Sequence, residues 1–277
     1  MSQDSLQDFA YAFLSILFEG APFILLGTLL SGFIDVFLPA RTMERLLPKS
    51  KAGAVLVSGL LGIIFPVCEC AVVPVIRRLV KKGLPVSCAL TYMLAAPIVN
   101  PVTALSTWKA FSGQDPVFMM TSRLVLGYLV AVAVGLVLLR IPIAKILKPS
   151  VAAGLKHRHE HSHHDHDHSH DGSRLTAALR SALRDFVDVG VYFAIGITIT
   201  ALFNTGIAPG SESIDQMATS TVGAPATLMF LAFLLSLCST SDAFIAATLA
   251  NFSYASRLAF LVFGPMMDVK LLFLYST

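Results

Sequence analysis

The sequence predicts an all-α polytopic membrane protein built from two structurally repeated halves. Hydrophobic residues make up 55% of the 277 residues and charged residues only 13%, and the mean hydropathy is +0.74. Seven apolar stretches are long enough to cross a hydrocarbon layer of about 30 Å. Polar and proline positions inside these stretches recur at a nearly constant spacing. This composition excludes an ordinary water-soluble enzyme. The sequence contains no Walker-type phosphate-binding loop, so ATP-driven pumping by this chain alone is not expected.

We expect every apolar stretch to be helical, because lipid offers no water to an open sheet edge. The first stretch follows Asp4 and Asp8 and has neither a basic region before it nor a clear cleavage site, so it predicts a retained span and no signal peptide. In chain order the stretches run from Phe9 to Leu38, Ala52 to Ile76, Leu84 to Phe111, Val117 to Leu139, Phe186 to Phe203, Pro225 to Ala250 and Leu258 to Tyr275.

Three motifs indicate an internal duplication, which is typical of secondary transporters. Their spacing varies by no more than two residues. It also predicts that the fourth stretch should recur beyond Thr277, so the second half should either lack its last helix or be shorter than the first. The matched positions are Glu19 with Asp188 and Gly27 with Gly196 (169 residues apart), Cys68 with Cys238 (170 apart), and Pro97 to Asn100 with Pro265 to Asp268 (168 apart).

Basic residues predict the orientation of the halves, because basic loops are usually cytoplasmic. They cluster from Arg41 to Lys51 and from Arg77 to Lys82, so the stretch between them should enter and leave by one face. We therefore expect a re-entrant hairpin, broken at 66–70, beside three full spans in each half. An odd number of crossings inverts the second half, whereas full crossing by every stretch would give parallel repeats. The expected organisation is a first transmembrane repeat over 1–140, a cytoplasmic His-rich linker over 141–174 and a second repeat over 175–277.

All eight histidines lie in the predicted linker, interleaved with acidic residues. Imidazole and carboxylate groups at this density are ligands for zinc, copper and nickel, so the tract predicts a cytoplasmic metal collector. A purification tag or a solvated low-complexity linker is the simpler alternative. The histidines are His157, His159, His161, His163, His164, His166, His168 and His170.

Three cysteines are candidate metal ligands within the membrane. Cys68 and Cys70 can serve one ion only if their backbone is not helical, and Pro66 favours such a break. Cys238 should approach from the other half. With Glu69 or Asp242 as an oxygen ligand, these thiolates would suit a tetrahedral zinc site or a trigonal copper(I) site. The fourth cysteine, Cys88, is expected to be an apolar filler.

Acidic residues inside apolar stretches are costly, which makes them candidates for ion binding or proton coupling. A carboxylate there can exchange a proton for a metal cation. Asp268 and Lys270 are alternatively a structural pair. The proton-coupling candidates are Glu19, Glu69, Asp188, Asp242 and Asp268, and the predicted ion path contains Cys68, Glu69, Cys70, Pro97, Asn100, Cys238, Ser239, Ser241, Asp242 and Asp268.

Four motifs resemble the signatures of the ArsP-type permease family. That family includes organoarsenical efflux permeases and a subgroup assigned to copper and zinc efflux, with two related halves joined by a variable loop. The resemblance implies a metal subgroup member, because the joining loop is rich in histidine. Family members usually continue into another helix, whereas this chain stops at Thr277. The motifs are Pro66 to Cys70, Ala96 to Pro101, Leu237 to Phe244 and Phe263 to Asp268.

Together these observations predict a transporter of a bacterial-type inner membrane that exports zinc or copper by proton antiport. Its expected partners are the lipid bilayer, metal ions and protons, with no cofactor and no nucleic acid. The oligomeric state stays open, a homo-oligomer included. An efflux permease for trivalent organoarsenicals such as methylarsenite is the alternative, and it would leave the histidines unexplained. A membrane metal sensor or assembly factor is a third reading, for which broken helices would serve no purpose.

Overall fold

The computed structural model describes residues 3–37, 39, 47–141, 171–206 and 223–275, and all regular structure in these ranges is helical. Three described segments are long and apolar enough to cross a membrane, namely Leu6–Phe37, Pro116–Leu138 and Leu175–Leu202. Shorter apolar helices accompany them. This confirms the predicted all-α membrane class. The histidine tract lies outside the described residues.

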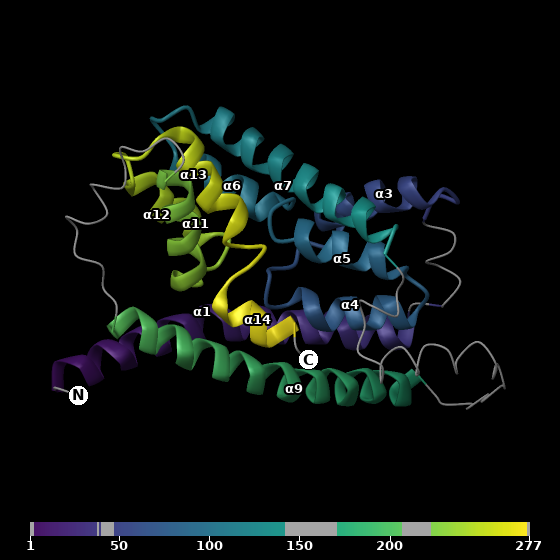
Figure 1. The fold of residues 1–277 in the computed structure, drawn as a ribbon. Coiled ribbons are helices and arrows are strands. Elements are labelled where there is room, and N and C mark those ends of the chain that lie inside the picture. The colour runs from purple at the N-terminus through teal and green to yellow at the C-terminus, as the bar shows by residue number, and fades with distance from the viewer. Residues whose placement is uncertain (1–2, 38, 40–46, 142–170, 207–222, 276–277) are drawn as a thin grey trace.

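Two long helices, α1 (Gln3–Phe37) and α9 (Asp171–Gly206), lie side by side along one edge of the molecule (Figure 1). They run antiparallel, since Gly20 meets Phe193 and Gly32 meets the backbone of Ala178. Small residues allow such close helix contact in a membrane protein. The main core lies between this pair and the first set of short helices.

Four of the predicted stretches are each broken into two short helices. Pro66 and Pro97 lie in two of the breaks, where proline removes a backbone donor and disfavours helix in the residue before it. In the third break Ser236 adopts a left-handed backbone, with φ of 49°. The broken pairs are α3 (Lys51–Ile64) with α4 (Val72–Lys81), α5 (Val86–Ala95) with α6 (Pro101–Ala110), α11 (Gly223–Leu235) with α12 (Ser241–Thr248), and α13 (Tyr254–Phe263) with α14 (Val269–Tyr275).

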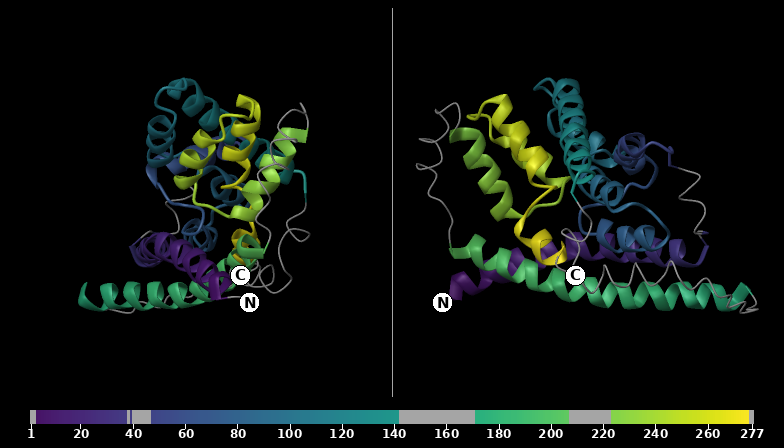
Figure 2. Two further views of the ribbon diagram at one scale, coloured as in Figure 1. Left: turned by 90° about the vertical axis from the view of Figure 1, so that its left-hand side faces the viewer. Right: turned by 45° about the vertical axis from the view of Figure 1, so that its right-hand side comes forward.

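One unbroken helix, α7 (Pro116–Leu138), crosses over the first set of short helices. Gly59 of α3 faces Tyr128, and Gly127 of α7 faces Ile98 in the break between α5 and α6. The helix also contacts α13 of the second set. It therefore joins the two halves along a side away from α1 and α9 (Figure 2).

The short helices gather toward two different ends. Helices α3, α4 and α5 lie toward the end where α9 begins, and α11, α12 and α13 lie toward the other (Figure 1). There the turn before α7 touches the turn before α13: the Tyr254 hydroxyl donates to the Asp115 carbonyl at 3.3 Å, and Arg257 donates to the Gln114 side chain at 2.7 Å.

Both halves begin with one long helix followed by two broken pairs of short helices. Their packing differs, because α1 packs on α4 whereas α9 packs on α14.

An ion-pair cluster ties α1, α4 and α9 together at the first end. Arg78 of α4 lies 3.0 Å from Asp35 of α1 and 3.0 Å from Asp185 of α9. Lys82 donates to the Asp35 carbonyl at 2.6 Å. These contacts fix the basic turn that the sequence predicted to be cytoplasmic against the two long helices.

Candidate functional site

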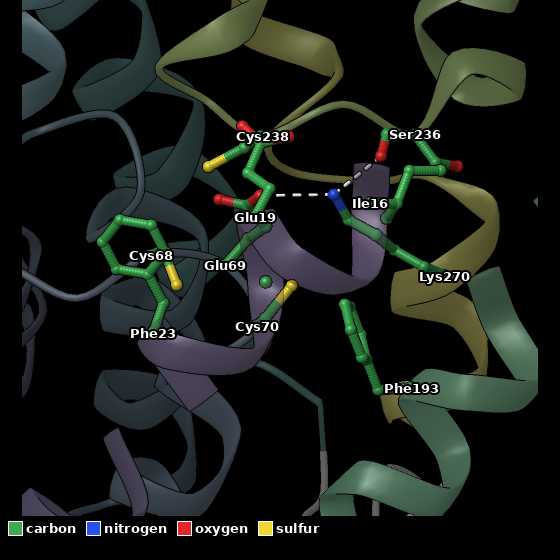
Figure 3. A pocket seen from close by; sticks show the side chains of 11 residues that line it. Ile16, Glu19, Phe23, Cys68, Glu69, Cys70, Phe193, Ser236, Cys238 and Lys270 are labelled. Carbon is green, nitrogen blue, oxygen red and sulfur yellow. Dashed lines mark hydrogen bonds and ion pairs between the residues drawn. The ribbon is translucent and has the colours of Figure 1, made fainter. Parts of the chain in front are cut away.

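A narrow pocket lies where the α3–α4 and α11–α12 breaks face α1 and α9 (Figure 3). Its cavity volume is about 10 Å³, which is about the space that one water molecule needs. The pocket brings together five residues predicted from the sequence and adds others. It is lined by Ile16, Glu19, Gly20, Phe23, Cys68, Glu69, Cys70, Phe193, Ser236, Cys238 and Lys270.

The three candidate cysteines reach the pocket because the backbone around them is not helical. The Val72 N–H donates to the Cys68 carbonyl at 3.1 Å, and the Asp242 N–H donates to the Cys238 carbonyl at 2.9 Å. Each cysteine carbonyl thus accepts from the residue four positions later, near the start of the next short helix. Cys70 and Cys238 are buried and Cys68 is half-buried. The predicted correspondence of Cys68 and Cys238 therefore extends to their backbone hydrogen bonds.

The pocket does not form a closed metal site in this conformation. Within the described ranges, no three His, Cys, Asp or Glu side chains stand close enough together to hold a metal ion. Asp242, predicted as an oxygen ligand, does not line the pocket. Its carboxylate instead faces the α13–α14 break, within 3.0 Å of the position that a Cβ atom on Gly264 would take.

Lys270 is the cation of the pocket. Its Nζ donates to the Ser236 carbonyl at 2.8 Å and the Leu237 carbonyl at 3.0 Å. It also lies 3.3 Å from a carboxylate oxygen of Glu69 and 3.4 Å from one of Asp268. All three charged side chains are at most 3% exposed. The sequence suggested only the Asp268 pair; Glu69 adds a contact from the other half.

A second buried cation, Arg123 of α7, bridges the halves behind the pocket. It donates to the Thr107 hydroxyl at 2.8 Å and to the Ser239 carbonyl at 2.8 Å, and it interacts electrostatically with Asp242. Sequence reasoning missed Arg123. The signal was present, because a basic residue inside an apolar stretch is as costly as an acidic one.

The remaining acidic candidates have different surroundings. Glu19 lines the pocket and accepts a short hydrogen bond from the Ser241 hydroxyl. Its predicted counterpart, Asp188, is exposed on α9 and does not line the pocket. The reason is the rotation of α9, which turns Val189 and Phe193 toward the core and Asp188 outward.

Asn100 and Asp268 both cap the short helix that follows them. The Asn100 side chain accepts from the Thr103 N–H at 2.8 Å, and Asp268 accepts from the Leu271 N–H at 2.7 Å. Such caps satisfy backbone donors that a helix start leaves free. Asn100 borders a separate apolar pocket of about 410 Å³, away from the thiols. The Pro97 carbonyl accepts from the Thr103 hydroxyl at 2.8 Å, so this break is held by local hydrogen bonds.

Comparison with known proteins settles the family. The profile of the ArsP_1 family, described as "Predicted permease", matches residues 5–277. The chain belongs to this permease family. It is 38% identical over 271 residues to the UPF0718 protein YcgR of Bacillus subtilis (strain 168), covering 97% of this chain and 88% of the relative.

A second relative comes from Streptococcus mutans and is named a putative two-component membrane permease complex subunit. It is 37% identical over 259 residues, which cover 93% of this chain and 82% of the relative. No solved structure matches the chain. The family and the apolar helices together make this protein a multi-pass membrane permease.

Proposed function

We propose that this permease exports a soft transition-metal ion, zinc or copper(I), across a bacterial-type inner membrane. The observation that carries the proposal is the cavity of about 10 Å³ bordered by Cys68, Cys70 and Cys238. Sulfur ligands from both halves favour a soft metal ion over hard cations. A cavity of this size can hold one metal ion or one water molecule. Methylarsenite is larger and would fit only if the pocket widened.

The charges around the thiols support coupling to protons. Two carboxyl groups, those of Glu69 and Asp268, lie against the single ammonium of Lys270, so acidic groups are available beside the thiols for a cation. Metal binding displaces thiol protons, because the thiolate is the ligand. The released protons can leave in the direction opposite to the metal, which is the basis of antiport. Glu19, on the α1 wall of the pocket, is a candidate carrier for them.

We also propose that the two halves are inverted, with the metal moving between them as one half rocks against the other. The turn between α4 and α5 corresponds in order to the turn between α12 and α13. The first lies beside the end of α1, where Lys82 contacts Asp35. The second lies beside the start of α7, where Tyr254 contacts Asp115. Corresponding turns at opposite ends support inversion over parallel repeats.

The test is uptake into everted membrane vesicles, with zinc, copper(I) and methylarsenite compared under an imposed proton gradient. We expect zinc or copper to accumulate with proton movement in the opposite direction. Serine substitution of Cys68 or Cys238 should weaken apparent metal affinity by at least about 10- to 100-fold. That is the loss typical for residues that hydrogen-bond to a metal ligand, and loss of a ligand itself should cost no less. Cys88→Ser is the matched control, since Cys88 is buried in the core outside the pocket.

The outcomes separate the two substrate classes. Accumulation of methylarsenite alone would make the protein an arsenical permease. Metal uptake that is unchanged in Cys68→Ser and Cys238→Ser would remove the thiols from the path.

The histidine tract is proposed to collect metal on the cytoplasmic side. Deletion of residues 157–170 should raise the metal concentration for half-maximal uptake and leave the maximal rate close to that of the full chain. Complete loss of uptake at saturating metal would instead place the essential site in the tract.

A further inference from the structure

The Lys270 ammonium is enclosed by four oxygen atoms drawn from both halves. Two are the carbonyls of Ser236 and Leu237, at 2.8 and 3.0 Å. Two belong to the carboxylates of Glu69 and Asp268, at 3.3 and 3.4 Å. Free carbonyls at a helix break together with carboxylates are the ligands by which membrane transporters hold alkali cations. Figure 3 shows the ammonium pointing toward Glu69 and Ser236.

We propose that Lys270 is a tethered cation that occupies an alkali-cation site. In this view the side chain takes the place of a bound sodium or potassium ion and holds the α3–α4 and α11–α12 breaks together. The inference shares Glu69, Asp268 and Lys270 with the proposed metal path, but it concerns a different cation and is tested without transport. It predicts that shortening Lys270 opens a site for a free alkali ion.

The occupant that Lys270 replaces carries one positive charge, as the ammonium does. Without a cation, Glu69 and Asp268 would be two buried carboxylates that repel one another, each at most 1% exposed. Leaving such charges unpaired is strongly destabilising. The carbonyls of Ser236 and Leu237 lie just beyond the end of α11, where helix carbonyls lack partners within the helix and carry partial negative charge. A single bound alkali cation would therefore replace the ammonium of Lys270 between the two carboxylates and the two carbonyls.

The backbone of Lys270 is held in place independently of its charge. The Cα atom lies 2.9 Å from the position that a Cβ atom on Gly196 would occupy, so α9 approaches the start of α14 only because residue 196 is glycine. Leu271 and Leu274 on the same short helix are fully buried. A shorter side chain at 270 should therefore leave the four oxygen atoms near their present positions and free the space between them.

The experiment measures thermal unfolding of the purified full chain in detergent, in sodium, potassium or N-methylglucamine chloride at equal ionic strength. We expect Lys270→Ala to unfold at a higher temperature in sodium or potassium than in N-methylglucamine, by on the order of 5 °C at saturation. The wild type and Lys270→Met should show no such difference, because the lysine or the thioether fills the site. Lys270→Ala combined with Glu69→Gln should respond less than Lys270→Ala alone, since half of the negative charge is gone.

Lys270→Ser provides a second test if Lys270→Ala is too unstable for unfolding curves. Both variants are then purified in potassium chloride and exchanged into each salt before size-exclusion chromatography. Loss of the monodisperse peak only in N-methylglucamine supports the proposal. Equal behaviour in all three salts, by either readout, overturns it. None of these readouts depends on transport, so a failure of the metal-export proposal would leave this result unaffected.

Discussion

At the residue scale, two buried cations in the described part of the chain link the two halves. Lys270 of the second half contacts Glu69 of the first, and Arg123 of the first half donates to the Ser239 carbonyl of the second. Several buried polar atoms in the described ranges still lack a hydrogen-bond partner, among them one oxygen each of Glu69 and Asp242. Glu69 lines the thiol pocket, whereas the unpaired Asp242 oxygen faces the α13–α14 break.

Arg123→Ala should lower the free energy of unfolding by about 1–3 kcal/mol, because the buried Ser239 carbonyl loses its donor and Asp242 loses the electrostatic attraction of the guanidinium. Adding Asp242→Asn to Arg123→Ala should recover part of the loss, since the second change removes the uncompensated charge. Thermal unfolding of both variants in detergent measures this coupling. Strictly additive losses would show that Arg123 acts only through packing and its Ser239 contact.

At the element scale, the breaks are positioned by close contact with the long helices. Gly27 of α1 meets Ala71, which follows Cys70 in the first break, and Gly196 of α9 meets Lys270 at the start of α14. These two glycines were matched in the sequence as repeat positions. Each glycine lies where a long helix touches a residue beside the pocket. Gly27 lies against the α3–α4 break and Gly196 lies beside the α13–α14 break, and these two breaks do not occupy the same place in their halves.

Gly27→Ala should destabilise the protein by about 1–3 kcal/mol and lower metal uptake, because the added Cβ would lie 2.9 Å from the Ala71 Cα and the backbone must move. Gly190→Ala is the matched control, since a Cβ there meets no atom within 4 Å. It should be neutral or slightly stabilising, as expected for glycine replacement in a helix. Thermal unfolding and vesicle uptake are compared for the two variants. Equal behaviour of both would contradict a packing role for Gly27.

At the scale of the whole molecule, inverted and parallel repeats predict different membrane faces for the turns between the short helices. Lys81 lies beside the turn that joins α4 and α5, whereas Ser112 and Asn251 lie in the two turns that meet near the start of α7. All three residues are exposed. Inversion therefore places the first residue on one membrane face and the other two on the opposite face.

Cysteine substitutions at these three positions test the arrangement with a membrane-impermeant maleimide. We expect Lys81→Cys to react in everted vesicles and not in intact cells, because its turn is basic and should be cytoplasmic. Ser112→Cys and Asn251→Cys should react in intact cells. The wild type gives the background from its native cysteines. Reaction of Lys81→Cys and Asn251→Cys from the same face would favour parallel repeats.

The sequence by itself determined the membrane class and indicated some of the helix breaks and the cysteines that line the pocket. Hydropathy fixed the class, because too few polar residues are present to cover a soluble surface. Pro66 predicted a break that the structure contains. Cys68, Cys70 and Cys238 were predicted to lie near one another, and they line one pocket. Local backbone chemistry suffices for these features, since proline and unpaired polar groups act within a few residues.

Only the tertiary structure decided which of the charged groups meet. Glu69 and Lys270 are 201 positions apart in the chain and form an ion pair, and Arg123 reaches Ser239 over 116 positions. Asp188 matched Glu19 by spacing, yet the rotation of α9 turns it away from the pocket. Partner choice depends on how helices rotate and cross, which is set by packing between segments distant in sequence. A motif read along one chain segment carries no information about that packing.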